Sequence, residues 1–222
     1  MKQIKILDFI SRVLPSAFFL YVVLLKVVDL FAFVKSRPGT NDPVFLRFLA
    51  DGVSRASIVC FLGLMSILFL IRLEPIQKAK GFLPRLMAIA GTFFVSLVTF
   101  FPRANLSTAQ MAIAGALVLL GTIISIFVLA HLGRSFSLMA EARRLVTTGP
   151  YRFVRHPLYL SEELAAFAVL LQFLSLKTLL IFIVHGLIQF QRMKNEEVVL
   201  QDAFPEYHAY KSRTARLIPG IY

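Results

Sequence analysis

The chain has 222 residues, of which 58% are hydrophobic, and its Leu, Ile, Val and Phe side chains are concentrated in long runs. A soluble domain is usually about half apolar, whereas a membrane-spanning helix needs ~20 apolar residues, so this pattern argues against a soluble enzyme and predicts one all-α domain embedded in a membrane. The formal net charge of +12 is explained by basic residues beside lipid headgroups, so we expect the lipid bilayer and no nucleic acid as a partner.

The first part of the chain, residues 1–132, predicts four membrane spans that carry no recognisable motif. They are expected at about Pro15–Val34, Val53–Ile71, Leu86–Phe101 and Ala109–Leu132. The segment 1–14 is either an amphipathic helix on the membrane surface or an early start of the first span.

A long apolar block from Leu158 to Met193 predicts two further helices. At ~1.5 Å per residue the block is too long for one span and long enough for two short ones. We therefore expect a helical hairpin with its turn near Leu174–Thr178, followed by a polar, aromatic tail, Lys194–Tyr222, that is helical in part. The total is about six transmembrane helices.

The distribution of Lys and Arg predicts the orientation of these helices. Most basic residues lie in the N-terminal segment, the connection after the second span, the polar stretch Gly133–Pro157 and the tail. The positive-inside rule places these regions, and both termini, in the cytoplasm.

The polar stretch ends in a sequence that indicates a site at the membrane surface. Gly149-Pro150 is a turn signal. Pro157 disfavours helical geometry at His156 and suits the first turn of the next helix, so His156 should lie just before a helix N-terminus, where anions and ligands bind. The alternative is a belt of interfacial Tyr and Arg residues.

A polar stripe marks the last membrane helix. His185, Gln189, Arg192 and Glu196 follow one another at helical spacing. Polar groups within a membrane helix normally face a protein interior or a wet cavity, so the stripe predicts a cavity; the alternative is a simple Arg192–Glu196 pair at the interface. Glu162 and Glu163 open the preceding helix, and we expect them to be solvated at its first turn.

Several common sites are absent from the sequence. It contains no G-x-G glycine loop, no G-K-[ST] phosphate loop and no G-x-S-x-G nucleophile turn. Its four histidines and single cysteine show no metal-binding spacing, so we expect no metal.

The C-terminal part of the chain resembles a known family. The run Gly149-Pro150-Tyr151-Arg152-x-x-Arg155-His156-Pro157-x-Tyr159 is followed by Glu196-Glu197, by Phe204-x-x-Tyr207-x-x-Tyr210 and by Arg216-Leu217-Ile218-Pro219. This order resembles the isoprenylcysteine carboxyl methyltransferases, which are related to the phospholipid N-methyltransferases. The resemblance covers about Gly133–Tyr222 and departs from the family pattern at Ser161 and Pro205.

The resemblance implies that residues 133–222 form the cofactor-binding and catalytic region of a membrane methyltransferase that uses S-adenosylmethionine. It also implies a lipophilic acceptor, such as a prenylated molecule, that enters from the membrane. The cofactor-binding positions that it implies are Tyr151, Arg155, His156, Pro157, Tyr159, Glu196 and Glu197.

The chemistry of the acceptor decides what else the site needs. A carboxylate of the isoprenylcysteine type, which we favour, is ionised near neutral pH and needs only an orienting arginine, for which Arg152 and Arg192 are candidates. An amine must lose a proton, and Glu197 or Glu163 could take it.

Two other functions remain open from the sequence. One is an NADPH-dependent reductase of the sterol-reductase type, which the ending Ile218–Tyr222 resembles. The other is a non-enzymatic lipid-binding or transport protein, although transporters more often contain repeated halves with helices broken near the midplane.

Overall fold

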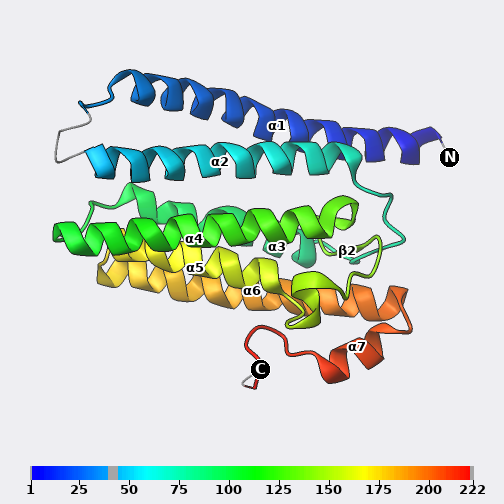
Figure 1. The fold of residues 1–222 in the computed structure, drawn as a ribbon. Helices are drawn as coiled ribbons and strands as arrows, with labels where there is room; N and C mark the ends of the chain where they lie inside the picture. The colour runs from blue at the N-terminus through cyan, green and yellow to red at the C-terminus, as the bar shows by residue number, and fades with distance from the viewer. Residues whose placement is uncertain (1, 40–44, 221–222) are drawn as a thin grey trace.

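The computed structural model describes residues 2–39 and 45–220. Residues 1 and 40–44 lie outside that description, as do residues 221–222 at the end of the predicted tail. Over the described ranges the chain is a bundle of antiparallel helices, with α1 and α2 stacked on one side of the remaining helices (Figure 1). The helices are α1 (Lys2–Lys35), α2 (Phe45–Ile71), α3 (Leu83–Phe93), α4 (Thr108–Leu132), α5 (Pro157–Gln172), α6 (Leu176–Ala203) and α7 (Tyr207–Arg213).

The first helix is continuous through a proline. α1 runs from Lys2 to Lys35 with Pro15 inside it, so the helix starts well before the predicted span. Proline lacks an N–H and leaves the carbonyl four residues earlier without its helical donor. That carbonyl belongs to Ser11, and Arg72 Nη2 at the end of α2 donates to it at 3.0 Å. Arg72 therefore satisfies the interruption and ties α1 to α2.

The third predicted span, Leu86–Phe101, forms two different helices. α3 ends at Phe93, and a 3₁₀ segment, η1 (Phe94–Phe100), continues it. Within this segment Ser96 Oγ donates to Phe93 O at 2.5 Å and Thr99 Oγ1 donates to Ser96 O at 2.7 Å. Hydroxyl groups that bond to the preceding turn in this way compete with α-helical geometry.

The predicted hairpin is formed by α5 and α6. Its turn is set by a capping box: Ser175 Oγ accepts from Thr178 N at 3.2 Å, and Thr178 Oγ1 accepts from Ser175 N at 2.9 Å. This pattern is a helix-start signal that does not need Gly or Pro. α6 then continues to Ala203, well beyond the apolar block.

Four helical segments in the described residues are long and apolar enough to cross a membrane. They are Phe9–Lys35, Asp51–Ile71, Leu83–Phe100 and Ala109–Ser135. These segments correspond to the four spans predicted for the first part of the chain. α5 has 16 residues, which gives a length of about 24 Å, shorter than a bilayer core of ~30 Å.

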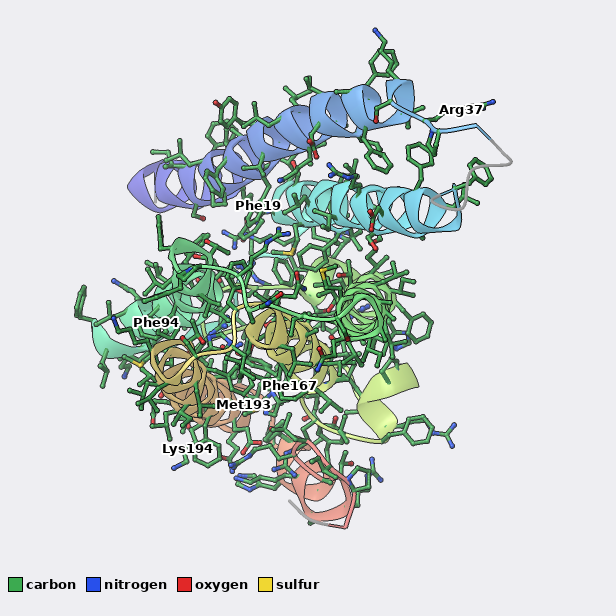
Figure 2. The ribbon with its side chains drawn as sticks, turned by 90° about the vertical axis from the view of Figure 1, so that its left-hand side faces the viewer. Phe19, Arg37, Phe94, Phe167, Met193 and Lys194 are labelled. Carbon is green, nitrogen blue, oxygen red and sulfur yellow. The ribbon has the colours of Figure 1, made fainter. Side chains whose placement is uncertain are left out.

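An aromatic cluster holds α1 and α2 against the rest of the bundle. The ring of Phe19 stacks on Phe69 with centroids 5.6 Å apart, and Phe69 meets Phe136 edge to face at 5.4 Å. Phe19 lies on the face of α1 that is turned toward α2 (Figure 2). Phe136 belongs to the connection between α4 and α5, so the cluster links both halves of the chain.

The polar connections gather at one end of the bundle. The N-terminus, the α2–α3 connection, the α4–α5 connection and α7 all lie at the right-hand end in Figure 1. A short antiparallel pair, β1 (Gln77–Lys78) with β2 (Glu141–Ala142), joins two of these connections. This end, which we call the polar end, corresponds to the regions that the Lys and Arg distribution assigned to one side of the membrane.

α4 and α5 approach each other closely at a glycine. A Cβ atom added to Gly121 would lie 2.9 Å from Ser161 O and 3.0 Å from Ala165 N. Ser125 and Ser161 also share a hydrogen bond of 2.8 Å between their hydroxyl groups at this contact. The small side chains bring the two helices together and thereby fix the position of α5.

We expect Gly121→Ala to lower the free energy of unfolding by about 1–3 kcal/mol, because an extra methyl group in a close contact forces the helices apart. Gly115 is a matched control in the same helix, since an added Cβ there meets nothing within 4 Å. Unfolding by a denaturing detergent, followed by circular dichroism, measures both variants. Equal effects of Gly121→Ala and Gly115→Ala would contradict this explanation.

Candidate functional site

A cavity of about 510 Å³ lies between the helices and reaches the polar end. Two stripes of side chains face it. The stripe on α6 consists of His185, Gln189, Arg192 and Glu196, as the sequence predicted, and the stripe on α5 consists of Tyr159, Glu162, Ala166 and Val169. Both stripes have spacings of three and four residues, which place their members on one helical face.

The cavity wall is polar at one end and apolar at the other. Ser135, Arg144, Tyr151, His156 and Glu196 contribute polar groups from the polar end, whereas Phe19, Ile58, Phe61 and Met65 contribute apolar side chains from the long helices α1 and α2. A space with one polar and one apolar part suits an amphipathic ligand or two ligands of different polarity.

The structure brings most of the predicted site residues to this cavity. The cavity is lined by Tyr151, Arg155, His156, Tyr159, Arg192 and Glu196. Three others are not part of the lining. Arg152 is exposed and its guanidinium lies 4.8 Å from the ring centroid of Phe153; Pro157 is the buried first residue of α5; Glu197 points into an ion-pair cluster beside the cavity.

The α4–α5 connection presents His156 as the sequence predicted. His156 is the residue before α5, with φ −127° and ψ 58°, and Pro157 occupies the first helical position. Earlier in the connection, Gly149 has a φ of +58°, and a Cβ there would overlap the ring of His131. Only glycine therefore permits this turn to pack against α4.

Glu197 is the centre of a buried ion-pair cluster, which we call the Glu197 cluster. Its Oε1 accepts from Arg155 Nε and from Arg216 Nε, each at 2.9 Å. Its Oε2 accepts from Arg216 Nη2 at 2.9 Å and lies 3.5 Å from Lys211 Nζ. His156 Nε2 is 3.2 Å from Oε1. The carboxylate is 3% exposed, so one buried charge connects α6, the α4–α5 connection and the tail.

Backbone bonds complete the attachment of the tail. Arg155 N donates to Ala215 O at 2.8 Å, and His156 N donates to Arg216 O at 3.1 Å. Nearby, Tyr210 Oη donates to Tyr151 O at 2.6 Å. Burial raises the pKa of Tyr210 to about 12, so this hydroxyl keeps its proton and remains a donor.

The charges in the cluster shift the pKa values of its members. Burial alone would raise the pKa of Glu197, but hydrogen bonds from His156 and the two arginines lower it far below the ordinary value. Burial alone would lower the pKa of His156, but hydrogen bonds to Glu196 and Glu197 raise it above 6.5. The cluster therefore favours an ionised Glu197 and a protonated His156.

We expect Glu197→Gln to lower the free energy of unfolding by about 3–5 kcal/mol, because it leaves buried cations without their counter-ion. Chemical unfolding in detergent micelles measures the change. Glu206→Gln, at an exposed position, is the control and should have almost no effect. A Glu197→Gln protein as stable as the control would show that the cluster does not hold the tail.

The raised pKa of His156 predicts a pH dependence of stability. The stabilisation from the protonated ring is complete below about pH 6.5, the ordinary value, and is lost as the pH rises through the raised pKa. The free energy of unfolding of the natural chain should therefore decline over that interval, and the decline should be smaller in His156→Gln. Parallel pH profiles of the two proteins would contradict the assignment.

On the cavity side of the cluster, Glu196 and three ring systems lie close together. His156 Nδ1 is 3.5 Å from Glu196 Oε2, and the carboxylate is 26% exposed. The rings of His156 and Tyr159 meet edge to face at 5.4 Å. Tyr207 lines the cavity, and its buried hydroxyl has no hydrogen-bond partner among the described residues. A carboxylate and a hydroxyl are thus available to a ligand.

Deeper along the cavity, polar side chains form a chain between α5 and α6. Arg192 Nη1 donates to Gln189 Oε1 at 2.6 Å, and Gln189 Nε2 donates to Glu162 Oε2 at 3.4 Å. His185 Nε2 lies 3.1 Å from Glu163 Oε1. The expectation that both carboxylates are solvated is therefore wrong for Glu162, because α5 packs against α6 and turns this carboxylate toward the polar stripe. The side chain of Glu163 is 26% exposed and contacts His185.

A glycine in α3 makes room for this polar chain. A Cβ at Gly91 would lie 2.6 Å from Gln189 Oε1 and would overlap Arg192 Cδ. The guanidinium of Arg192 also lies 5.1 Å from the ring centroid of Tyr159. α3 and α5 together fix the position of this arginine in the cavity wall.

Sequence reasoning missed several polar residues of the cavity and the cluster, among them Glu162, Tyr207 and Arg216. Glu162 could have been found from its spacing with Tyr159 and Ala166, which repeats the pattern of the α6 stripe. Tyr207 and Arg216 belong to the quoted family motifs, but nothing in the local sequence indicates that their side chains reach α6.

Comparison with known proteins supports the family resemblance. Residues 113–202 match the model of the isoprenylcysteine carboxyl methyltransferase (ICMT) family. This segment begins in α4 and ends in the last turn of α6, so it contains both cavity stripes, His156 and the Glu196–Glu197 pair. A search of curated proteins found no match for the chain. The four apolar helices indicate an integral membrane protein, and the matched segment is similar to a family of membrane methyltransferases.

Proposed function

We propose that this chain transfers a methyl group from S-adenosylmethionine to a lipophilic acceptor that enters from the membrane. The observation that carries this proposal is the cavity, because one space joins a carboxylate, an imidazole and tyrosine rings at its polar end to an apolar wall from α1 and α2. The family match favours this function over a reductase or a lipid carrier.

The residues at the polar end fit the proposed cofactor. The partly exposed Glu196 carboxylate suits the ammonium group or the ribose hydroxyls. The Tyr207 hydroxyl, which has no hydrogen-bond partner in the described part of the chain, suits a further polar atom. The rings of Tyr151, His156 and Tyr159 suit the flat adenine base. When bound, S-adenosylmethionine supplies a methyl group already activated by its sulfonium.

The protein's own contribution is therefore to position the reactants. Arg155 lines the cavity and is held by Glu197, while His156 is held between Glu196 and Glu197. Holding these groups before the reactants bind reduces the entropy cost of reaching the reactive geometry. In this proposal Glu197 is a positioning residue and Glu196 binds the cofactor.

Of the two arginine candidates, Arg192 is the one placed where an acceptor in the cavity can reach it. It lines the cavity and is 8% exposed, whereas Arg152 lies on the surface outside the cavity. Glu197 is a poor candidate for proton removal, because its two oxygens are already occupied by arginines.

We further propose that α5 and α6 also enter the membrane, with α5 as a short span, which gives six spans with the polar end in the cytoplasm. The outer faces of these helices support this, since they expose large apolar side chains, among them Phe167, Leu176, Leu180 and Leu187. Such a surface is stable in lipid and costly in water. The basic residues at the polar end support the cytoplasmic assignment.

Titration calorimetry with S-adenosylhomocysteine, the demethylated product, tests the cofactor. The full chain in lipid nanodiscs should bind it, and Glu196→Gln should weaken binding by roughly 10- to 100-fold, as expected for a hydrogen bond to a charged group. Glu206→Gln is the control of the same chemistry at an exposed position. Absence of binding by the natural chain would overturn the proposal, and unchanged affinity in Glu196→Gln would exclude that carboxylate.

A further inference from the structure

A second group of polar side chains lines the deeper part of the cavity. It consists of Glu162, His185, Gln189 and Arg192, and we call it the inner polar group. At a rise of ~1.5 Å per residue, Arg192 lies about 6 Å along α6 from Glu196, Gln189 about 10 Å and His185 about 16 Å. The inner polar group therefore begins one helical turn from the end of the cavity assigned to the cofactor and extends away from it.

Arg192 is linked to a carboxylate within this group through a neutral amide. Gln189 connects Arg192 to Glu162, because its amide oxygen accepts from Arg192 Nη1 at 2.6 Å and its amide nitrogen donates to Glu162 at 3.4 Å. Arg192 Nη2 additionally donates to Leu138 O at 3.4 Å. A carboxylate entering beside Arg192 would have to displace one of these bonds, and it would face the carboxylate of Glu162 across a single amide.

The inner polar group nevertheless has unused hydrogen-bonding capacity. In the described part of the chain, Arg192 Nε and His185 Nδ1 are buried and have no partner. Arg192 is 8% exposed and His185 is 2% exposed, and buried polar groups of this kind usually have a partner when the native ligand is present. Glu162 receives one long hydrogen bond there, from Gln189, so its carboxylate can accept another.

Resting on the proposed function, we infer that the inner polar group binds the head group of the methyl acceptor, and that this head group carries a proton, as in a lipophilic amine or alcohol. A head group of this kind donates its proton toward Glu162 and places its lone pair toward the wider cavity. A carboxylate has no such proton and brings a second negative charge to Glu162, so the group selects against it.

In the transfer step one bond forms and one bond breaks. The lone pair of the acceptor nitrogen or oxygen forms a bond to the methyl carbon, and the carbon–sulfur bond breaks with its electron pair remaining on the sulfur, which becomes a neutral thioether. One proton of the acceptor passes to the Glu162 carboxylate, which acts as the general base. An ammonium group gives up this proton before the attack, which frees its lone pair, and an alcohol gives it up as the new bond forms. No oxidant or metal is needed.

The inference is tested by binding rather than by turnover. Radiolabelled dodecylamine, dodecan-1-ol and dodecanoate share one chain and differ in head group, and each is titrated onto the full chain in lipid nanodiscs, with empty nanodiscs as background. We expect dodecylamine and dodecan-1-ol to bind at least tenfold more tightly than dodecanoate. In Glu162→Gln the affinity for dodecylamine should fall at least tenfold while that for dodecanoate rises.

Two further variants control this experiment. Glu162→Asp keeps the carboxylate and should keep the order of affinities, which also provides a readable result if Glu162→Gln does not fold. Glu206→Gln, on the surface, should behave as the natural chain. The inference is overturned if dodecanoate binds the natural chain as tightly as dodecylamine, or if the order of affinities is the same in Glu162→Gln and in the natural chain.

Binding of S-adenosylhomocysteine to the same samples separates the two proposals. If the product binds and the three probes bind equally, the acceptor inference alone fails. If the product does not bind but the order of affinities holds and depends on Glu162, the cofactor proposal fails and the inner polar group remains a site for proton-bearing lipids.

Discussion

The buried carboxylate of Glu197 holds the polar end of this protein together. It binds Arg155 from the α4–α5 connection and Arg216 from the tail, and it contacts His156 at the start of α5. Two segments far apart in the sequence, the end of the α4–α5 connection and the tail, are therefore fixed to α6 by one residue. The wall of the cavity at this end exists because these segments meet there, so the geometry of every proposed ligand contact depends on this ion-pair cluster.

The cavity itself depends on close contacts between helices. Gly121 brings α4 against α5, and Gly91 allows α3 to approach Gln189 and Arg192. With the surrounding helices placed in this way, the polar side chains of the α5 and α6 stripes face the cavity and are shielded from lipid, where they would be costly. The polar stripe of α6 is therefore stable inside the bundle, because it faces the cavity and because Glu162 on α5 faces the same cavity.

Much of this arrangement was predictable, and the exceptions have physical causes. The four long apolar runs and the stripe from His185 to Glu196 follow from hydrophobic length and helical spacing, which are local properties. The hairpin turn was located, but the capping box of Ser175 and Thr178 that determines it was not recognised. The environment of Glu162 could not be derived from α5 alone, because it depends on which face of α6 lies opposite. The same is true of Arg216, whose partner Glu197 lies on another helix and is reached only through the fold of the tail.

The two adjacent carboxylates of α6 show how strictly its rotation is fixed. Successive residues of an α-helix point about 100° apart. Glu196 therefore points into the cavity while Glu197 points toward α7. In the same way, Met193 lies inside the bundle and Lys194 projects away from it (Figure 2). Insertion of one residue between Gln189 and Glu196 would turn Glu196 toward the cluster, and deletion of one residue would turn Glu197 toward the cavity. The two glutamates have the same side chain but cannot replace each other. The rotation of α6 about its axis decides that Glu196 faces the proposed ligand and that Glu197 holds the ion-pair cluster.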